Sequence, residues 1–111
     1  MDTGKLTVIV SEKFHEDLKN IFRYGIEIFG YNSALQFHRN IENLINNLET
    51  AYYMYPECRF LVTKSKIYRN IILESYLVIY RITTNRIEVL RVFHSSICTS
   101  SRIRRVRKII I

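Results

Sequence analysis

The 111-residue chain is 48% hydrophobic and contains three glycines and one proline, which indicates one globular domain and excludes a disordered or collagen-like chain. Its net charge of +7 is uneven, because residues 1–80 carry nine basic and nine acidic side chains, whereas residues 81–111 carry eight basic side chains and one acid, Glu88. This concentration of positive charge predicts an anionic partner: a nucleic acid, an acidic protein segment or a membrane surface.

The first predicted elements are a strand and a helix. A short β-branched run over residues 6–10 predicts the strand. Ser11 then offers an N-cap to a helix whose apolar side chains recur at helical spacing as far as Phe29. Gly30 is expected to stop this helix in the left-handed region of backbone space.

A second helix is expected to follow almost at once. Ser33 and Gln36 resemble a capping box, and the apolar spacing continues to Tyr53 before a break at Pro56. Because only a few residues separate the two helices, they are expected to form an antiparallel hairpin.

After the second helix the hydrophobic period changes from about 3.6 to about 2, which predicts strands over residues 67–74, 76–83 and 86–94. Their short connections predict an antiparallel meander. The order β-α-α-β-β-β predicts an α+β fold in which the helical hairpin covers one face of the sheet and leaves the other free. The compact domain is expected to span residues 1–98, and residues 99–111 are expected to form a basic tail.

Several classes of protein are excluded by what the sequence lacks. No apolar run approaches the ~18 residues of a membrane span, and no signal-peptide pattern opens the chain, so we expect a cytoplasmic protein without a membrane partner. Cys58 and Cys98 match no metal spacing and are expected to be reduced thiols, with a disulfide as the alternative. Without a phosphate loop, paired carboxylates or a nucleophile elbow, we expect no cofactor, no metal and no small-molecule substrate.

Two strand motifs carry a family resemblance. Residues 76–82 read YLVIYRI and residues 85–94 read NRIEVLRVFH. Together with the order of elements, they resemble the "gYrilYrv" and "ilrvlH" strands of the RelE/ParE superfamily of toxins from type II toxin–antitoxin (plasmid stabilisation) modules. The resemblance extends from Leu6 to His94. It implies the RelE/ParE-like fold and, as a partner, a small cognate antitoxin that wraps the toxin.

The superfamily divides by activity. RelE-like members cut messenger RNA in the ribosomal A site with clustered Lys and Arg, whereas ParE-like members lack that set and inhibit DNA gyrase. Where the ribonucleases have an Arg in the central strand, this chain has Leu77. Where they have Lys on the preceding strand, it has Tyr68, Arg69 and Asn70. Residues 95–98 lack the basic residue and the Tyr that usually follow the last strand.

The resemblance therefore favours the ParE-like branch. His94 matches the strand-end His of ParE-like toxins, although the Arg and Asp that follow it there are missing. The implied function is a toxin that binds and inhibits DNA gyrase. The alternative is a metal-free, ribosome-dependent messenger RNA endoribonuclease, and a third interpretation is an unrelated basic RNA-binding domain. The residues that a ribonuclease would use for attack by the ribose 2′-OH are Lys64, Lys66, Arg69, Arg81 and His94.

The candidate binding residues belong mostly to the basic third of the chain. Arg81 alternates with Tyr80 and Ile82, so it is expected to point to the open face and to pair with phosphate or carboxylate, or else to be solvated. Alternation does not decide which face Arg91 takes. The residues expected to bind the target or the antitoxin are Arg81, Arg91, His94, Arg102, Arg104, Arg105, Arg107 and Lys108.

Alternatives stay open for each of these groups. Residues 102–108 either bind nucleic-acid phosphates, receive an acidic antitoxin segment or form a solvated tail. Contact with an anionic membrane through residues 109–111 is a further alternative, although no amphipathic helix of useful length supports it. His94 is either an acid–base group or a strand-end His bonded to the main chain. The aromatic cluster of residues 52–55 either stacks on bases or packs beneath a loop. An antitoxin helix or strand is expected to dock on the free sheet face and the tail.

Overall fold

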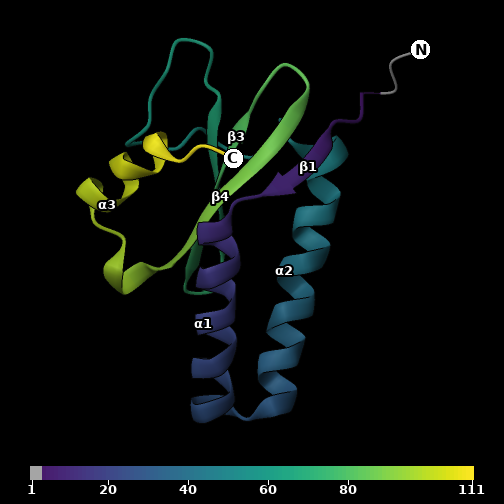
Figure 1. Ribbon diagram of the computed structural model, residues 1–111, viewed down its shortest axis with the longest axis vertical. Helices are drawn as coiled ribbons and strands as arrows, with labels where there is room; N and C mark the ends of the chain where they lie inside the picture. The colour runs from purple at the N-terminus through teal and green to yellow at the C-terminus, as the bar shows by residue number, and fades with distance from the viewer. Residues whose placement is uncertain (1–3) are drawn as a thin grey trace.

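Four strands and three α-helices make up residues 4–111, the part of the chain that the computed structural model describes. In chain order the elements, with the two short 3-10 turns labelled η, are β1 (Thr7–Val10), α1 (Glu12–Phe29), α2 (Tyr31–Ala51), β2 (Tyr68–Leu73), β3 (Tyr76–Ile82), β4 (Arg86–His94), η1 (Ser95–Ile97), α3 (Ser100–Arg105) and η2 (Val106–Lys108). The predicted order β-α-α-β-β-β is confirmed, and α3 follows it as an additional helix (Figure 1).

Helices α1 and α2 form the predicted antiparallel hairpin, which projects beyond the sheet (Figure 1). Gly30 alone joins them, with a φ of +90° that favours glycine, and its N–H donates to the Ile26 carbonyl at 3.1 Å. The expected capping box at Ser33 is wrong: α2 begins at Tyr31, because a single glycine is enough to reverse the chain. Within residues 4–111, no helix combines the length and the apolar character that crossing a membrane requires.

The strands form one sheet in the order β1-β4-β3-β2. The last three strands make the predicted antiparallel meander, and β1 lies parallel to β4, with Thr7 opposite Arg86 and Val10 opposite Val89. The first and last strands are therefore neighbours. Because α1 follows β1 directly, its first turns lie beside the second half of β4.

A β-bulge in β4 decides the direction of Arg91. The register pairs Ile79 with Arg91, but it pairs the next residue of β3 with Val89, so Leu90 is the extra residue. Arg91 therefore lies on the side of Phe93, with its guanidinium carbon 4.5 Å from the centre of the Phe93 ring. Without the bulge, regular alternation would place Arg91 and Val89 on the same face of the sheet.

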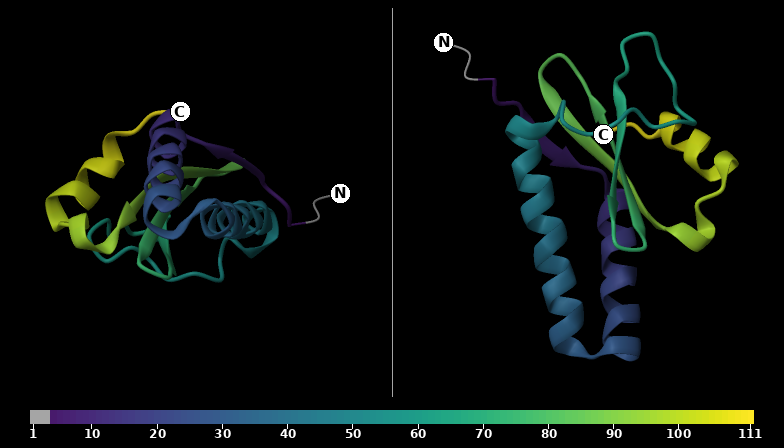
Figure 2. Two further views of the ribbon diagram at one scale, coloured as in Figure 1. Left: turned by 90° about the horizontal axis from the view of Figure 1, so that it is seen from below. Right: turned by 180° about the vertical axis from the view of Figure 1, so that it is seen from behind.

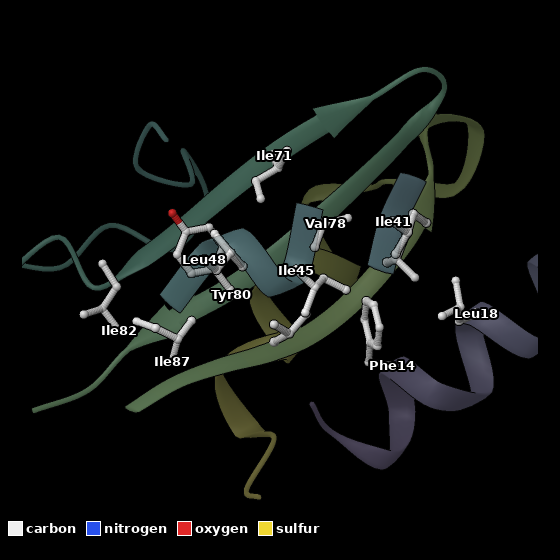
Figure 3. Packing of buried hydrophobic residues seen from close by; sticks show 12 residues of the cluster. Phe14, Leu18, Ile41, Ile45, Leu48, Ile71, Val78, Tyr80, Ile82 and Ile87 are labelled. Carbon is white, nitrogen blue, oxygen red and sulfur yellow. The ribbon is translucent and has the colours of Figure 1, made fainter. Parts of the chain in front are cut away.

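Side chains are buried on both faces of the sheet. Between the sheet and the hairpin (Figure 3) lie Phe14, Leu18, Ile41, Ile45, Leu48, Ile71, Val78, Tyr80, Ile82, Ile87, Val89 and Val92. On the other face lie Cys58, Leu61, Tyr68, Ile79, Leu90, Phe93, Ile103 and Val106. The second cluster contains residues of α3, of η2 and of the connection between α2 and β2. The face that the sequence predicts to be free is therefore covered.

Within residues 99–111, predicted as a tail, residues 100–108 form α3 and η2. Ile103 and Val106 are three residues apart, so they share one side of the helical segment, and both are buried against the sheet. Thr99 caps α3 by accepting a hydrogen bond of 3.2 Å from the Arg102 N–H. Figure 2 shows α2 and α3 separated by the sheet. A segment whose sequence is dominated by charge thus docks through two apolar side chains.

Ile103 tests whether α3 belongs to the folded body. Replacing it by alanine is expected to lower the free energy of unfolding by about 2–5 kcal/mol, because the change removes buried methyl groups and leaves a cavity. Urea denaturation measures this difference. The matched control is Ile110→Ala, at a side chain that is 92% exposed, for which a change within about 0.5 kcal/mol is expected. Equal effects of the two changes would contradict the docking of α3.

Candidate functional site

The start of α1 is attached to the edge of β4 beyond its pairing with β1. That pairing ends at Val89. Further along, the Ser11 hydroxyl donates to the Leu90 carbonyl at 2.6 Å, and an Asp17 carboxylate oxygen accepts from the Val92 N–H at 3.1 Å. These side chains satisfy main-chain groups at a sheet edge, where an unpaired donor or acceptor is costly.

The Asp17 carboxylate also binds Arg91 with both oxygens. The Arg91 Nε lies 2.7 Å from Oδ2 and Nη2 lies 2.9 Å from Oδ1, a bidentate pair that holds both planar groups in place. The sequence predicts Arg91 as a binding residue and does not single out Asp17. The two residues are 74 positions apart, so nothing local in the sequence signals the pair.

Glu88, the single acid of the basic third, is 5% exposed and joins two arginines. Arg81 Nε donates to its Oε1 at 2.7 Å and Arg86 Nε to its Oε2 at 2.9 Å. Burial by itself raises the pKa of Glu88, but the hydrogen bonds and charges of the two arginines outweigh burial and hold this pKa below its usual range. Arg81 therefore lies on a covered face with an internal partner, where the sequence predicts an open face.

The same arginines hold the C-terminal segment. Arg81 Nη2 donates to the Ile109 carbonyl at 2.9 Å, and Arg86 Nη2 lies 3.4 Å from the main-chain oxygen of Ile111. Together with the buried side chains of α3 and η2, these contacts attach residues 99–111 to the strands.

Basic side chains cover the outer side of α3 and η2. The α3 basic surface consists of the exposed residues Arg102, Arg104, Arg105, Arg107 and Lys108. Within residues 4–111, none of these five has an acidic partner in an ion pair. Arg104 and Arg107 lie over the rings of Phe60 and Tyr68, with 5.7 and 5.9 Å from guanidinium carbon to ring centre. Within the basic third, the cations that have no acidic partner among the described residues all lie on this segment.

A cleft of about 210 Å³, which we call the basic cleft, opens between α1, β4 and the C-terminal segment. It is lined by Lys13, Arg91, Phe93, Arg102, Arg105, Val106 and Ile109. Lys13 approaches Glu16 at 4.0 Å with both side chains well exposed, a pair that contributes little. The sequence does not single out Lys13, because a lone lysine in a first helical turn carries no signal of a distant arginine.

A larger and mainly apolar hairpin groove lies between α1, α2 and the adjoining ends of β3 and β4. Its two connected parts, of about 460 and 530 Å³, share Ile21, Tyr24, Tyr76 and His94. Phe29, which lines the groove, is 69% exposed, and beyond it the tip of the hairpin exposes Ile28 at 55% and Tyr31 at 57%. Such a surface suits a partner with an apolar face.

His94 stands at the rim of the hairpin groove. Its Nδ1 accepts a hydrogen bond of 3.1 Å from the Ser96 N–H, so the neutral ring carries its proton on Nε2. The Tyr76 ring meets it edge-on, with 5.1 Å between ring centres. The contact is that of a strand-end His bonded to the main chain, and it leaves Nε2–H as a donor.

The residues predicted for ribonuclease chemistry occupy separate places. Lys64 and Lys66 are exposed in the connection between α2 and β2. Arg69 turns toward the end of α2, where its Nη1 donates to the Tyr55 carbonyl at 2.8 Å. Because Arg69 is paired with the residue next to Arg81 across β2 and β3, these two arginines lie on opposite faces of the sheet.

Arg81 and His94 are also far apart along the strands. The register places Arg81 opposite Glu88 and His94 opposite Tyr76. Tyr76 and Arg81 are five residues apart in β3, which corresponds to roughly 16 Å. The structure therefore does not bring Lys64, Lys66, Arg69, Arg81 and His94 into one site.

Other residues singled out in the sequence have structural contacts. Tyr52 and Tyr55 pack against the hairpin-side core, whereas Tyr53 and Met54 are exposed. Cys58 and Cys98 are free thiols, and burial raises the pKa of both, which lowers their reactivity. Across residues 4–111, no group of three or more His, Cys, Asp or Glu side chains is placed to hold a metal ion.

Comparisons with known proteins identify the family and the fold. Residues 8–97 match the family model described as the ParE toxin of type II toxin–antitoxin systems, parDE. Among solved structures, the chain is similar to one titled "Chromosomal ParDE TA system from P. aeruginosa", with a TM-score of 0.68 and 17% identity over 83% of this chain and 98% of that one. At this identity the likeness shows the fold alone. No match was found among curated proteins.

The pH dependence of stability tests the network of Glu88 with Arg81 and Arg86. The pKa of Glu88 is lowered in the folded state, so its stabilisation is present above the ordinary glutamate pKa of about 4.3 and is lost as the pH falls through the lowered value. Glu88→Gln is expected to cost roughly 3 kcal/mol at neutral pH, because two arginines lose their counter-charge.

Urea denaturation at a series of pH values measures this difference. The free energies of unfolding of the wild type and the Glu88→Gln variant are expected to converge in acid. Glu27→Gln, at an exposed position of α1, serves as the control and is expected to change little. A gap between wild type and Glu88→Gln that stays constant with pH would contradict the network.

Proposed function

This chain belongs to the ParE toxin family of type II toxin–antitoxin systems, and on that premise we propose that it acts in the cytoplasm by binding and inhibiting DNA gyrase. Its second partner is a cognate antitoxin that neutralises it. The toxin works by contact and breaks no bond. The observation that carries this choice over RNA cleavage is the dispersal of the candidate ribonuclease residues over both faces and both ends of the sheet.

RNA cleavage without a metal needs several groups at one phosphate. A base must reach the 2′-OH, and cations must lie within hydrogen-bond distance of the phosphate oxygens as charge develops there. Arg81 is committed to Glu88, and Arg69 to the carbonyls at the end of α2. His94 lies on the hairpin side, away from Arg81. The exposed Lys64 and Lys66 alone supply no such constellation.

The α3 basic surface is the proposed contact with the target. Its residues combine exposure with the lack of an acidic partner in residues 4–111. A field of one sign accelerates encounter with an acidic protein surface and selects its orientation. Because α3 covers the sheet face that the sequence predicts to be free, that face is not a docking surface, and the α3 basic surface takes its place. Arg81 and Arg91 are not part of this surface. Arg81 binds the C-terminal segment through the Ile109 carbonyl, and Arg91 binds α1 through Asp17.

Purified protein is expected to slow DNA supercoiling by gyrase and to leave messenger RNA intact in a translating extract. The double change Arg104→Glu and Arg107→Glu is expected to raise the concentration for half-inhibition by roughly tenfold or more, because it replaces charge-assisted contacts with repulsion. The charge-matched control is Arg23→Glu with Arg39→Glu, on exposed positions of α1 and α2.

Two outcomes would overturn the proposal. Unchanged supercoiling at protein concentrations that arrest growth would exclude gyrase as the target. Cleaved messages in the translating extract would favour the ribonuclease alternative, despite the dispersed residues.

A further inference from the structure

We propose that the basic cleft binds a backbone phosphate of duplex DNA. The site combines Lys13 of α1 with Arg102 and Arg105 of the C-terminal segment, above Arg91 of β4. The chemistry points to a phosphate in a nucleic-acid duplex, and the choice of DNA rests on the proposed function, since gyrase holds duplex DNA. The toxin would then touch both the enzyme and its substrate.

Charge is the first argument for an anion in the cleft. Its lining contains four basic side chains and no acidic one. Arg91 is neutralised by Asp17, whereas Arg102 and Arg105 have no ion pair within residues 4–111. Cations held close together repel one another, and a bound anion relieves that repulsion. Guanidinium forks and an ammonium group are the usual ligands of phosphate oxygens.

The surrounding aromatic rings favour backbone contact over recognition of bases. Phe93 lies beneath Arg91, and Phe60 is approached by Arg59 at 5.2 Å and by Arg104 at 5.7 Å, measured from guanidinium carbon to ring centre. Single-stranded nucleic acid is usually bound by stacking its bases on open aromatic faces. Rings that already carry guanidinium groups offer no such platform, so a phosphate contact with a paired duplex fits better.

The size of the cleft and its position favour a polyphosphate backbone over an acidic peptide. About 210 Å³ admits one anionic group, and the neighbouring Arg104, Arg107 and Lys108 lie outside it on the same segment. A duplex presents one charge per ~1.7 Å of its axis, so a phosphate in the cleft brings others to the outer cations. An acidic peptide gains specificity from pockets for its side chains, which this cleft does not provide.

The backbone segments on the two sides of the cleft are held in place before a ligand arrives. Ile103 and Val106 fix α3 and η2 on the sheet, and Asp17 fixes both α1 and Arg91. The cations on the two sides of the cleft are therefore positioned by elements far apart in the sequence. A preorganised site loses less conformational freedom on binding.

Fluorescence anisotropy with a short labelled DNA duplex tests the proposal, with the salt concentration varied. Each phosphate contact contributes about 0.9 to the slope of log affinity against log salt. Because one phosphate occupies the cleft, Arg102→Ala with Arg105→Ala is expected to lower that slope by about one, and Lys13→Ala by at most the same amount. At low salt each lost contact is expected to weaken binding about tenfold.

Matched controls separate the cleft from the charge of the protein as a whole. Lys19→Ala removes an exposed lysine from the same helix as Lys13, and Arg23→Ala with Arg39→Ala removes two exposed arginines outside the cleft. These variants are expected to retain most of the affinity and the salt slope. Thermal unfolding checks that every variant is folded. If the cleft variants lose no more affinity and no more salt slope than the control variants, the proposal is overturned.

Two further measurements distinguish the possible ligands and the two proposals. Polyglutamate that binds more tightly than the duplex at equal ionic strength, and loses affinity in the cleft variants, would assign the cleft to an acidic protein and overturn the DNA proposal. DNA binding by a protein that does not inhibit gyrase would uphold the cleft and remove the proposed function. Inhibition of gyrase without measurable DNA binding would uphold the proposed function and overturn the proposal that the cleft binds DNA.

Discussion

The arrangement of the whole molecule depends on the Asp17 carboxylate, which binds the Val92 N–H and the Arg91 guanidinium together. Strand β1 has only four residues, so it covers β4 only as far as Val89. Beyond Val89, α1 lies along the edge of β4. There the Asp17 carboxylate accepts the hydrogen bond from the Val92 N–H that a main-chain carbonyl of a longer β1 would accept. This contact holds α1 against β4 where the hairpin leaves the sheet. It also separates the two concave surfaces, because Asp17 lines the hairpin groove and Arg91 lines both that groove and the basic cleft.

The basic residues of positions 81–111 fall into two groups, one in internal ion pairs and one exposed to solvent. Glu88 and Asp17 are the acids that neutralise Arg81, Arg86 and Arg91, all three on the strands of the basic third. The remaining cations of that third lie on α3 and η2, where they are exposed. Each partly buried arginine of the basic third therefore has a counter-charge, which offsets the cost of removing an ion from water. The cations of that third that lack an acidic partner within residues 4–111 lie on one short segment, where a partner can reach them.

The fold is compatible with two activities, and the positions of a few side chains support the proposal of target binding over RNA cleavage. A ribonuclease would need its cations on one face around the end of the meander. Here Arg69 and Arg81 point to opposite faces, and both satisfy groups of the protein itself. What the molecule presents outward is a basic segment and an apolar groove, which are features of a protein that acts through its contacts.

The sequence by itself determined the two helices and the three-stranded meander, because the hydrophobic period, the Ser11 cap and the Gly30 stop are local properties. Through the strand motifs it also indicated the family. It also located the excess charge. Only the tertiary structure decided which cations are available. The partners of Arg81 and Arg91 come from across the sheet and from α1, and the bulge that turns Arg91 depends on how β4 pairs with β3. The docking of α3 depends on a sheet face completed by distant residues, and local pattern carries no information about such contacts.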